Sequence, residues 1–206
     1  MQVWDLSRHR QGATATRRTA GKIWPMRDNN RCRITTIDTP IGPLLAGARD
    51  DGICVISFPL PERTARELDA LKRRLRCEIE SGDHPHLAQL RAELNDYFGQ
   101  RLTSFAVPVI TAGTPFQERV WTELRRIRYG ETCSYEELAT AVGAPGAQRA
   151  VGHANGSNPV PIVIPCHRVI NKSGKLGGYG GELWRKEVLL RLERSHMTLP
   201  FDGRAG

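Results

Sequence analysis

The starts of two helices are the most explicit structural signals in this chain. Thr114 precedes Pro115 and stands three residues before Gln117, and Ser134 stands three residues before Glu137. In each pair the hydroxyl can accept a hydrogen bond from the backbone amide of the third helical residue, whose side chain can accept one from the cap. Apolar residues at helical spacing follow both capping boxes. We therefore expect one helix to begin directly after each cap.

The second of these helices belongs to a helix-turn-helix pattern. It is expected to end at Gly143, and Pro145-Gly146 then leads into a further helix over residues 147–155. That further helix is poor in bulky side chains, so its backbone could approach another surface closely, and Arg149 projects from its first turn. Close packing on a nucleic acid and close packing on the domain's own core are both compatible with this pattern.

The first half of the chain has the pattern of a sheet followed by helices. Residues 32–58 carry β-branched and apolar runs separated by turn sequences at 39–42 and 50–52, which predicts a three-stranded antiparallel meander. Apolar side chains at helical spacing then predict one helix over residues 62–80 and another after Pro85. Nothing in this half has catalytic spacing, so we expect it to act as a scaffold.

Composition excludes several classes of protein. Hydrophobic residues make up 39% of the chain and charged residues 25%, the balance of a folded globular protein. The longest apolar stretches, such as residues 160–164, have about five residues, far short of the roughly 20 that a membrane span needs. Residues 107–206 hold 13 basic and 9 acidic residues, which favours a polyanionic partner.

The cysteines argue against metal chemistry. There are five, an odd number, and they stand at least 22 residues apart, which excludes the CxxC motifs of zinc and redox sites. His84-Pro85-His86 is interpreted as the loop before a helix. We therefore expect a reducing compartment, no metal and no cofactor.

One cysteine stands in a different setting from the others. Residues 158–165 form an apolar segment restricted by three prolines, and Cys166 follows directly, beside His167. A cysteine becomes a useful nucleophile only as a thiolate, which a neighbouring imidazole can promote by accepting the proton. We interpret Cys166 as the nucleophile and the other four cysteines as buried and inert.

At Pro165-Cys166-His167-Arg168 the sequence closely resembles the alkylguanine-DNA alkyltransferases, also called methylated-DNA–protein-cysteine methyltransferases. The likeness runs from about residue 32 to 200. It is strongest at seven motifs that occur in the family's order: residues 113–117, 129–132, 134–135, 149–152, 158–159, 164–170 and 177–179.

The resemblance implies an irreversible, stoichiometric repair reaction. The alkyl group passes from the 6-oxygen of guanine in duplex DNA, and also from the 4-oxygen of thymine, onto Cys166. It further implies that His167 is the base, that Glu193 orients it, and that Asn158 fixes the turn that carries the cysteine. Tyr179 would support the departing guanine. From the sequence alone, Glu193 looks like an ordinary acid on a helix surface.

The resemblance also implies a DNA surface and a base pocket. An alkylated base must be rotated out of the duplex before a cysteine can reach it. Arg149 would fill the gap that is left, and Tyr135 would crowd the adjacent phosphate, while the small-residue helix approaches the minor groove with Ala147, Ala150, Gly152 and Asn155. The base pocket would be lined by Pro161, Val169, Gly177, Gly178 and Gly180. Position 180 is often serine in the family, so any side-chain contact is lost here.

The expected fold class is α+β. A small N-terminal α/β domain with an antiparallel sheet (32–106) precedes a mostly helical C-terminal domain (107–200) with a helix-turn-helix and an active-site loop. Residues 1–31 are expected to be a basic, disordered extension, within which Met26 could be the true start, and 201–206 a tail. The expected partner is double-stranded DNA with alkylated guanine, with no membrane and no obligate protein partner, in a bacterial cytoplasm or nucleoid.

Three alternatives belong to other classes. A lesion-binding protein without repair activity would lack the acceptor, whereas Cys166 is present. A bifunctional transcriptional regulator would carry an extra cysteine-rich zinc domain, whereas residues 1–31 contain no cysteine. A cysteine hydrolase rarely has its base next to its nucleophile in the sequence.

Overall fold

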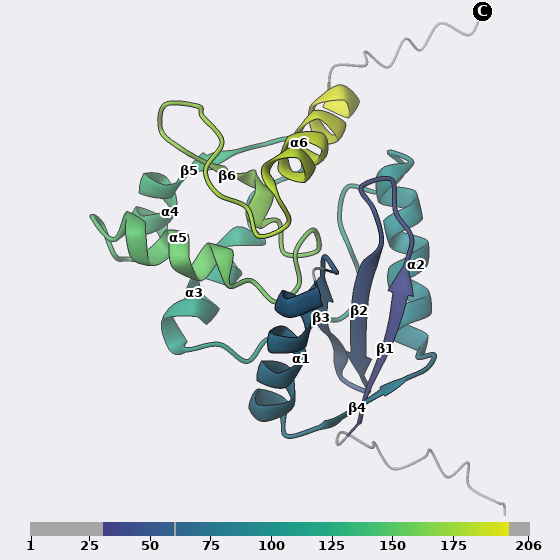
Figure 1. Ribbon diagram of the computed structural model, residues 1–206. Coiled ribbons are helices and arrows are strands. Elements are labelled where there is room, and N and C mark those ends of the chain that lie inside the picture. The colour runs from purple at the N-terminus through teal and green to yellow at the C-terminus, as the bar shows by residue number, and fades with distance from the viewer. Residues whose placement is uncertain (1–30, 60, 198–206) are drawn as a thin grey trace, which may run out of the picture.

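A computed structural model describes residues 31–59 and 61–197, and Figure 1 shows two parts. The N-terminal part is a four-stranded sheet with one helix on each face. The C-terminal part consists mostly of helices that surround a small two-stranded sheet. This two-domain arrangement agrees with the expected α+β class.

The expected antiparallel meander is confirmed. Its strands are β1 (Arg31–Ile37), β2 (Leu44–Arg49) and β3 (Gly52–Ser57). With a fourth strand, β4 (Glu78–Ser81), the sheet order is β3-β2-β1-β4. The turn between β1 and β2 closes where the Gly42 amide donates to the Thr39 carbonyl at 2.9 Å. Gly42 has a φ of +99°, which only glycine adopts without strain, so this residue fixes the turn.

The predicted helix over residues 62–80 is wrong at its C-terminal end. Helix α1 (Pro61–Leu75) stops earlier, Arg76 takes a left-handed φ of +49°, and strand β4 (Glu78–Ser81) follows. Because β4 pairs with β1 in parallel, the sheet is mixed and not antiparallel throughout. The strand covers the open edge of β1, and Cys77 just before it is buried beneath α1. A helix that continued to residue 80 would leave this edge of β1 unpaired.

The two helices of this part cover opposite faces of the sheet. Helix α2 (Pro85–Phe98) is the helix expected after Pro85, and it buries Leu87, Leu90, Leu94 and Tyr97 in the main core. Helix α1 packs Leu71 on the other face, where Cys32, Cys54, Val55 and Cys77 complete a smaller cluster. The sheet therefore presents two apolar surfaces: the α2 side belongs to the main core shared with the C-terminal part, and the α1 side meets that part through Ile110.

Both predicted capping boxes are confirmed, at Thr114 with Gln117 and at Ser134 with Glu137. The helix that begins after Ser134 ends near Gly143, which has a φ of +72°. The elements of this part are α3 (Pro115–Leu124), β5 (Cys133–Ser134), α4 (Tyr135–Ala141), α5 (Gln148–Gly156), the 3-10 turn η1 (Cys166–Arg168), β6 (Val169–Ile170) and α6 (Leu183–Met197). Helices α4 and α5 form the predicted helix-turn-helix.

Backbone hydrogen bonds join the two parts directly. The Ile56 amide donates to the Pro159 carbonyl at 2.8 Å, and the Ile110 amide donates to the Ile53 carbonyl at 2.8 Å. In the described part of the chain no helix is long and apolar enough to cross a membrane. The domain limits at 106 and 107 stay predictions. The predicted extension, except for Arg31, and the predicted tail lie outside the described residues.

Candidate active site

Cys166 lies at the start of η1 and is 5% exposed. The Asn158 side chain holds the turn that leads to it: its Nδ2 donates to the Ile164 carbonyl at 2.8 Å, and its Oδ1 accepts from the Val160 amide at 3.0 Å. The Asn155 Nδ2 donates to the Cys166 carbonyl at 3.3 Å. Two amide side chains therefore fix the backbone on either side of the thiol.

His167 and Glu193 lie behind this thiol, and both are fully buried. Nε2 of His167 lies 2.9 Å from Glu193 Oε1, and a carboxylate there requires that nitrogen to carry the proton. Nδ1 is then the nitrogen with the free lone pair. It is buried and has no hydrogen-bond partner among the described residues, so it is available to accept a proton.

Glu193 collects hydrogen bonds from several directions. Arg168 donates to it twice, from Nε and from Nη2, each at 2.9 Å, the Tyr97 hydroxyl donates at 2.7 Å, and the Gly130 amide at 3.1 Å. Burial alone would raise its pKa, but the hydrogen bonds and charges of His167 and Arg168 outweigh burial and lower the pKa to about 2. Glu193 is therefore a fixed carboxylate, not the exposed acid that the sequence suggests.

The other titratable groups of the site are shifted toward neutrality. Burial raises the pKa of the Cys166 thiol, although the Asn158 hydrogen bond and the Lys186 charge oppose it. Burial also lowers the pKa of His167, more than the Glu193 carboxylate raises it. The site therefore rests as a thiol beside a neutral imidazole, the state in which a base can still accept a proton.

A cavity of about 20 Å³ opens beside Cys166, with room for about one water molecule. Of the residues expected to line the base pocket, Pro161, Gly178 and Gly180 line this cavity. Gly177 and Val169 do not line it: Gly177 packs against the Tyr135 ring, and Val169 is fully buried with its carbonyl bonded to Lys186 Nζ at 2.7 Å. The full lining is Phe58, Asn155, Gly156, Asn158, Pro161, Cys166, Gly178, Tyr179, Gly180 and Gly181.

The loop over residues 177–181 rests on the N-terminal part. The Tyr179 ring packs edge-on against Phe58 with centroids 6.0 Å apart, and a side chain at Gly181 would overlap the Phe58 ring. Arg185 ties the same contact together, because it donates to the Ile41 carbonyl at 2.8 Å and to the Gly181 carbonyl at 3.1 Å. The N-terminal part thus supplies Phe58 as one wall of the cavity beside Cys166.

A broad hollow of about 780 Å³ lies on the outer face of the helix-turn-helix, next to this loop. Of the predicted DNA-contacting residues, Arg149, Tyr135 and Gly152 line it, together with Gly177, Gly178 and Gly180. Ala150 is exposed and Ala147 half-buried. Asn155 is 3% exposed, so it differs from the prediction: α5 turns it inward to hold Cys166 rather than outward to DNA.

Sequence reasoning missed four residues of this site: Tyr97, Phe58, Arg168 and Lys186. Lys186 precedes Glu193 by seven residues on α6, with Leu189 and Leu190 between them at helical spacing. This i, i+3, i+7 stripe contains the signal that both charged residues are buried. Tyr97 and Phe58 carry no such signal, because each reaches the site from another domain.

The geometry defines a class of protein. A buried cysteine, followed in the chain by a histidine that is bonded to a buried carboxylate, lines a small cavity close to a helix-turn-helix whose surface hollow is lined by Arg149. These features define the class as a DNA-binding protein with a buried thiol beside its DNA-facing surface.

Comparisons with known proteins identify the family. Residues 32–111 match the family described as 6-O-methylguanine DNA methyltransferase, ribonuclease-like domain, and residues 115–195 match its DNA binding domain. The chain is 48% identical over 161 residues to a Mycobacterium tuberculosis methylated-DNA–protein-cysteine methyltransferase, across 78% of this chain and 91% of that protein. A constitutive Bacillus subtilis protein of the same name is 40% identical, across 78% and 94%.

Solved structures agree. A crystal structure of the M. tuberculosis protein in complex with DNA has a TM-score of 0.68 at 44% identity, covering 81% of this chain and 94% of that one. The enzyme from Pyrococcus kodakaraensis has a TM-score of 0.62 at 25% identity, covering 79% and 98%. The chain belongs to the 6-O-methylguanine DNA methyltransferase family. Its activity is direct-reversal DNA repair, with transfer of a methyl group from DNA to a cysteine of the protein.

Proposed function

We propose that Cys166 accepts the alkyl group and that His167 and Glu193 prepare it. Nδ1 of His167 takes the thiol proton through one water molecule, and Glu193 stabilises the imidazolium that results. The thiolate attacks the alkyl carbon, a sulfur–carbon bond forms, and the carbon–oxygen bond breaks with its electron pair on the guanine. The observation that carries this proposal is that Cys166 lines a small cavity and is followed in the chain by His167, whose Nε2 is bonded to the buried Glu193 while its Nδ1 has no partner among the described residues.

The proposal assigns the remaining residues to holding and positioning. Lys186 lies close enough for its charge to favour the thiolate, and the Tyr179 hydroxyl supports the departing guanine. Arg149 fills the gap that the rotated base leaves, and Tyr135 crowds the neighbouring phosphate. Because a cavity of about 20 Å³ is far too small for guanine, the loop over 177–181 moves outward before the base enters.

Three further parts of the proposal concern scope. The 4-oxygen of thymine is a second alkyl donor, which a competition assay with a methylthymine oligonucleotide tests.

The protein acts as a monomer in the cytoplasm or nucleoid of a bacterium, in keeping with described cysteines that are all free thiols. Its domains are residues 32–106 and 107–200, which limited proteolysis tests.

One experiment tests the acceptor. The protein is incubated with a duplex that carries labelled 6-O-methylguanine, and the label is located by peptide mass mapping. We expect at most one label per chain, on Cys166, and no transfer by Cys166→Ala, which still binds the lesion because its phosphate contacts are intact. Cys133→Ala is the matched control, because Cys133 is the other thiol of the C-terminal part. Transfer by Cys166→Ala would end the proposal.

A further inference from the structure

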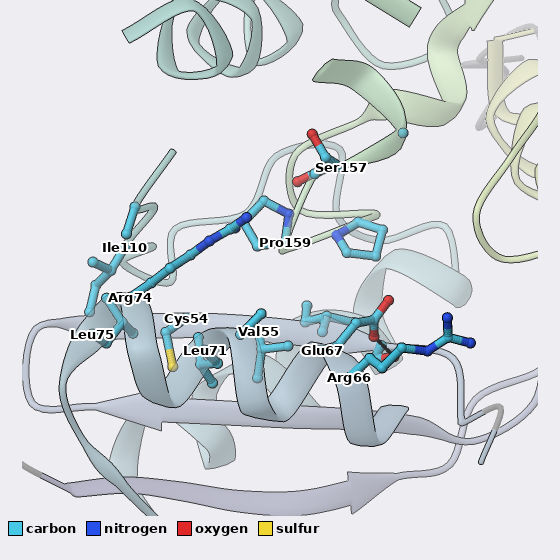
Figure 2. Close-up of a pocket in the computed structure, with 17 residues that line it drawn as sticks. Cys54, Val55, Arg66, Glu67, Leu71, Arg74, Leu75, Ile110, Ser157 and Pro159 are labelled. Carbon is cyan, nitrogen blue, oxygen red and sulfur yellow. Dashed lines mark hydrogen bonds between the residues drawn. The ribbon is translucent and has the colours of Figure 1, made fainter. Parts of the chain in front are cut away.

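A larger cavity lies between the two parts of the molecule. It is on the far side of residues 156–161, the segment that also lines the small cavity beside Cys166. Its volume is about 510 Å³, within the range of about 300–1,000 Å³ that is typical of small-molecule sites. Figure 2 shows α1 and β3 on one side and Ser157, Pro159 and Ile110 on the other. Three residues line both this cavity and the one beside Cys166: Gly156, Asn158 and Pro161.

The middle of this interdomain cavity is apolar. Its lining includes Val55, Ile56, Leu71, Leu75, Ile110 and Pro159. These side chains come from a strand, a helix and two connecting segments, so their positions are fixed by the fold of both parts. Such a surface suits the apolar body of a ligand and offers it no hydrogen-bonding partner.

Charge is placed at the ends of the cavity. Arg74 extends from α1 toward Pro159, and it makes no hydrogen bond or ion pair with any residue that the structure describes (Figure 2). Arg66 and Glu67 lie toward the other end, where the Glu67 carboxylate already accepts a hydrogen bond from the Ser57 hydroxyl. Arg74 is therefore a positive charge at one end of the cavity with no paired counter-charge among the described residues, which favours an anionic ligand there.

A ligand bound in the interdomain cavity would contact the segment that also lines the small cavity beside Cys166. The Pro159 carbonyl accepts from the Ile56 amide, and Asn158 is bonded both to Val160 and to the Ile164 carbonyl. The segment over residues 156–161 is thus held on one side by the N-terminal sheet and on the other by the turn that carries Cys166. A ligand that fills the interdomain cavity would brace this segment from behind.

We propose that the interdomain cavity binds a small amphipathic anion, an aryl or alkyl carboxylate or sulfonate whose head pairs with Arg74. The bound anion slows alkyl transfer, because a braced wall yields less when a base enters the small cavity beside Cys166. The binding stands independently of the proposed chemistry, whereas the slowing rests on Cys166 as the acceptor.

Binding is tested on the full chain with 8-anilinonaphthalene-1-sulfonate as the probe. We expect a saturable fluorescence increase with one site per chain, weakened several-fold by Arg74→Gln. Arg73→Gln is the matched control, because it removes the same charge from the neighbouring position of α1, which does not line the cavity. Ala70→Phe, which fills the cavity, is expected to abolish binding. Equal effects of the two arginine variants would overturn the site.

Coupling is tested by the rate of reaction with free 6-O-benzylguanine, with and without saturating probe. We expect the wild-type rate to fall several-fold and the rate of Ala70→Phe to be independent of the probe. An unchanged wild-type rate at saturation would overturn the coupling. If instead the acceptor is another residue, Cys166→Ala would react at the wild-type rate while probe binding stayed intact, so the two failures are distinguishable.

Discussion

The two parts of the molecule contribute to the site in different ways. The C-terminal part supplies every group that we propose to react, and these come from a short motif and one face of α6. The N-terminal part supplies support: the Tyr97 hydroxyl on Glu193 and the Phe58 ring against the loop of Tyr179. The reacting groups follow local sequence patterns, whereas the supporting groups depend on how two domains pack.

The largest effect is expected from the carboxylate of the C-terminal part. Glu193→Gln weakens the orientation of His167 and leaves Arg168 buried without its counter-charge. We expect single-turnover transfer to slow by about 10²–10⁴-fold, the usual contribution of a positioned acid or base. We also expect the free energy of unfolding to fall by about 3–5 kcal/mol in urea titrations. A rate within threefold of wild type would contradict the role of Glu193.

A second variant separates DNA handling from chemistry within the C-terminal part. Arg149→Ala removes the proposed wedge but leaves the buried groups untouched. Without a side chain to fill the gap in the stack, rotation of the base costs a few kcal/mol more, so transfer from duplex DNA should slow about 10–100-fold. Reaction with free 6-O-benzylguanine should stay within about twofold, because no base needs rotating. Arg128→Ala, an exposed arginine of equal charge, is the matched control. Equal losses on both substrates would refute the wedge.

The reach of sequence reasoning follows the same division. Capping boxes and the helix-turn-helix are local, so the helix starts after Thr114 and Ser134 follow directly from the sequence. The cysteine motif is local too, but the role that it gives to Cys166 stays a prediction. Strand β4 was missed because Ile79 is stabilised more by pairing with Cys32 of β1, and Cys77 more by burial in the cluster beneath α1, than either would be by continuing a helix. Tyr97 shows only the helical spacing of a core residue in the sequence, since its partner Glu193 is 96 residues away in the chain.

The supporting role of the N-terminal part can be measured through Tyr97. Tyr97→Phe keeps the ring but removes a hydrogen bond to a carboxylate, which contributes about 1.5–3 kcal/mol. With one donor fewer, Glu193 becomes a stronger acceptor for His167, so the pKa of His167 should rise. We therefore expect transfer to slow about tenfold or less, and the fall of the rate at low pH to begin at a higher pH than in wild type.

The pH profile distinguishes a positioning role from a purely structural one. Burial lowers the pKa of His167, so in the wild type the base stays neutral below its usual value of about 6.5. A variant that is only less stable would transfer less alkyl group in total, but the pH at which its rate falls on the acid side would not change. If the acid side of the pH–rate profile is not shifted in Tyr97→Phe, or if its rate of transfer falls as much as that of Glu193→Gln, the distinction between reacting and supporting domains would be wrong.

The smallest effect concerns the protein after transfer. The cavity beside Cys166 holds about one water molecule, so a methyl group nearly fills it, whereas a benzyl group must displace the loop over 177–181. We expect methylation to lower the free energy of unfolding by about 1 kcal/mol and benzylation by about 3 kcal/mol. Hydrogen exchange should quicken in this loop and around residues 147–155, where Val151 and Ala154 share the core with Cys166. Exchange in β1, β2 and β3 should not change, because the N-terminal part meets the loop at its margin, through the Phe58 ring against Tyr179 and through the Ile41 carbonyl that accepts from Arg185 of α6. A higher melting temperature after alkylation would refute the packing argument, and faster exchange throughout the sheet would show that both domains respond to the transfer as one unit.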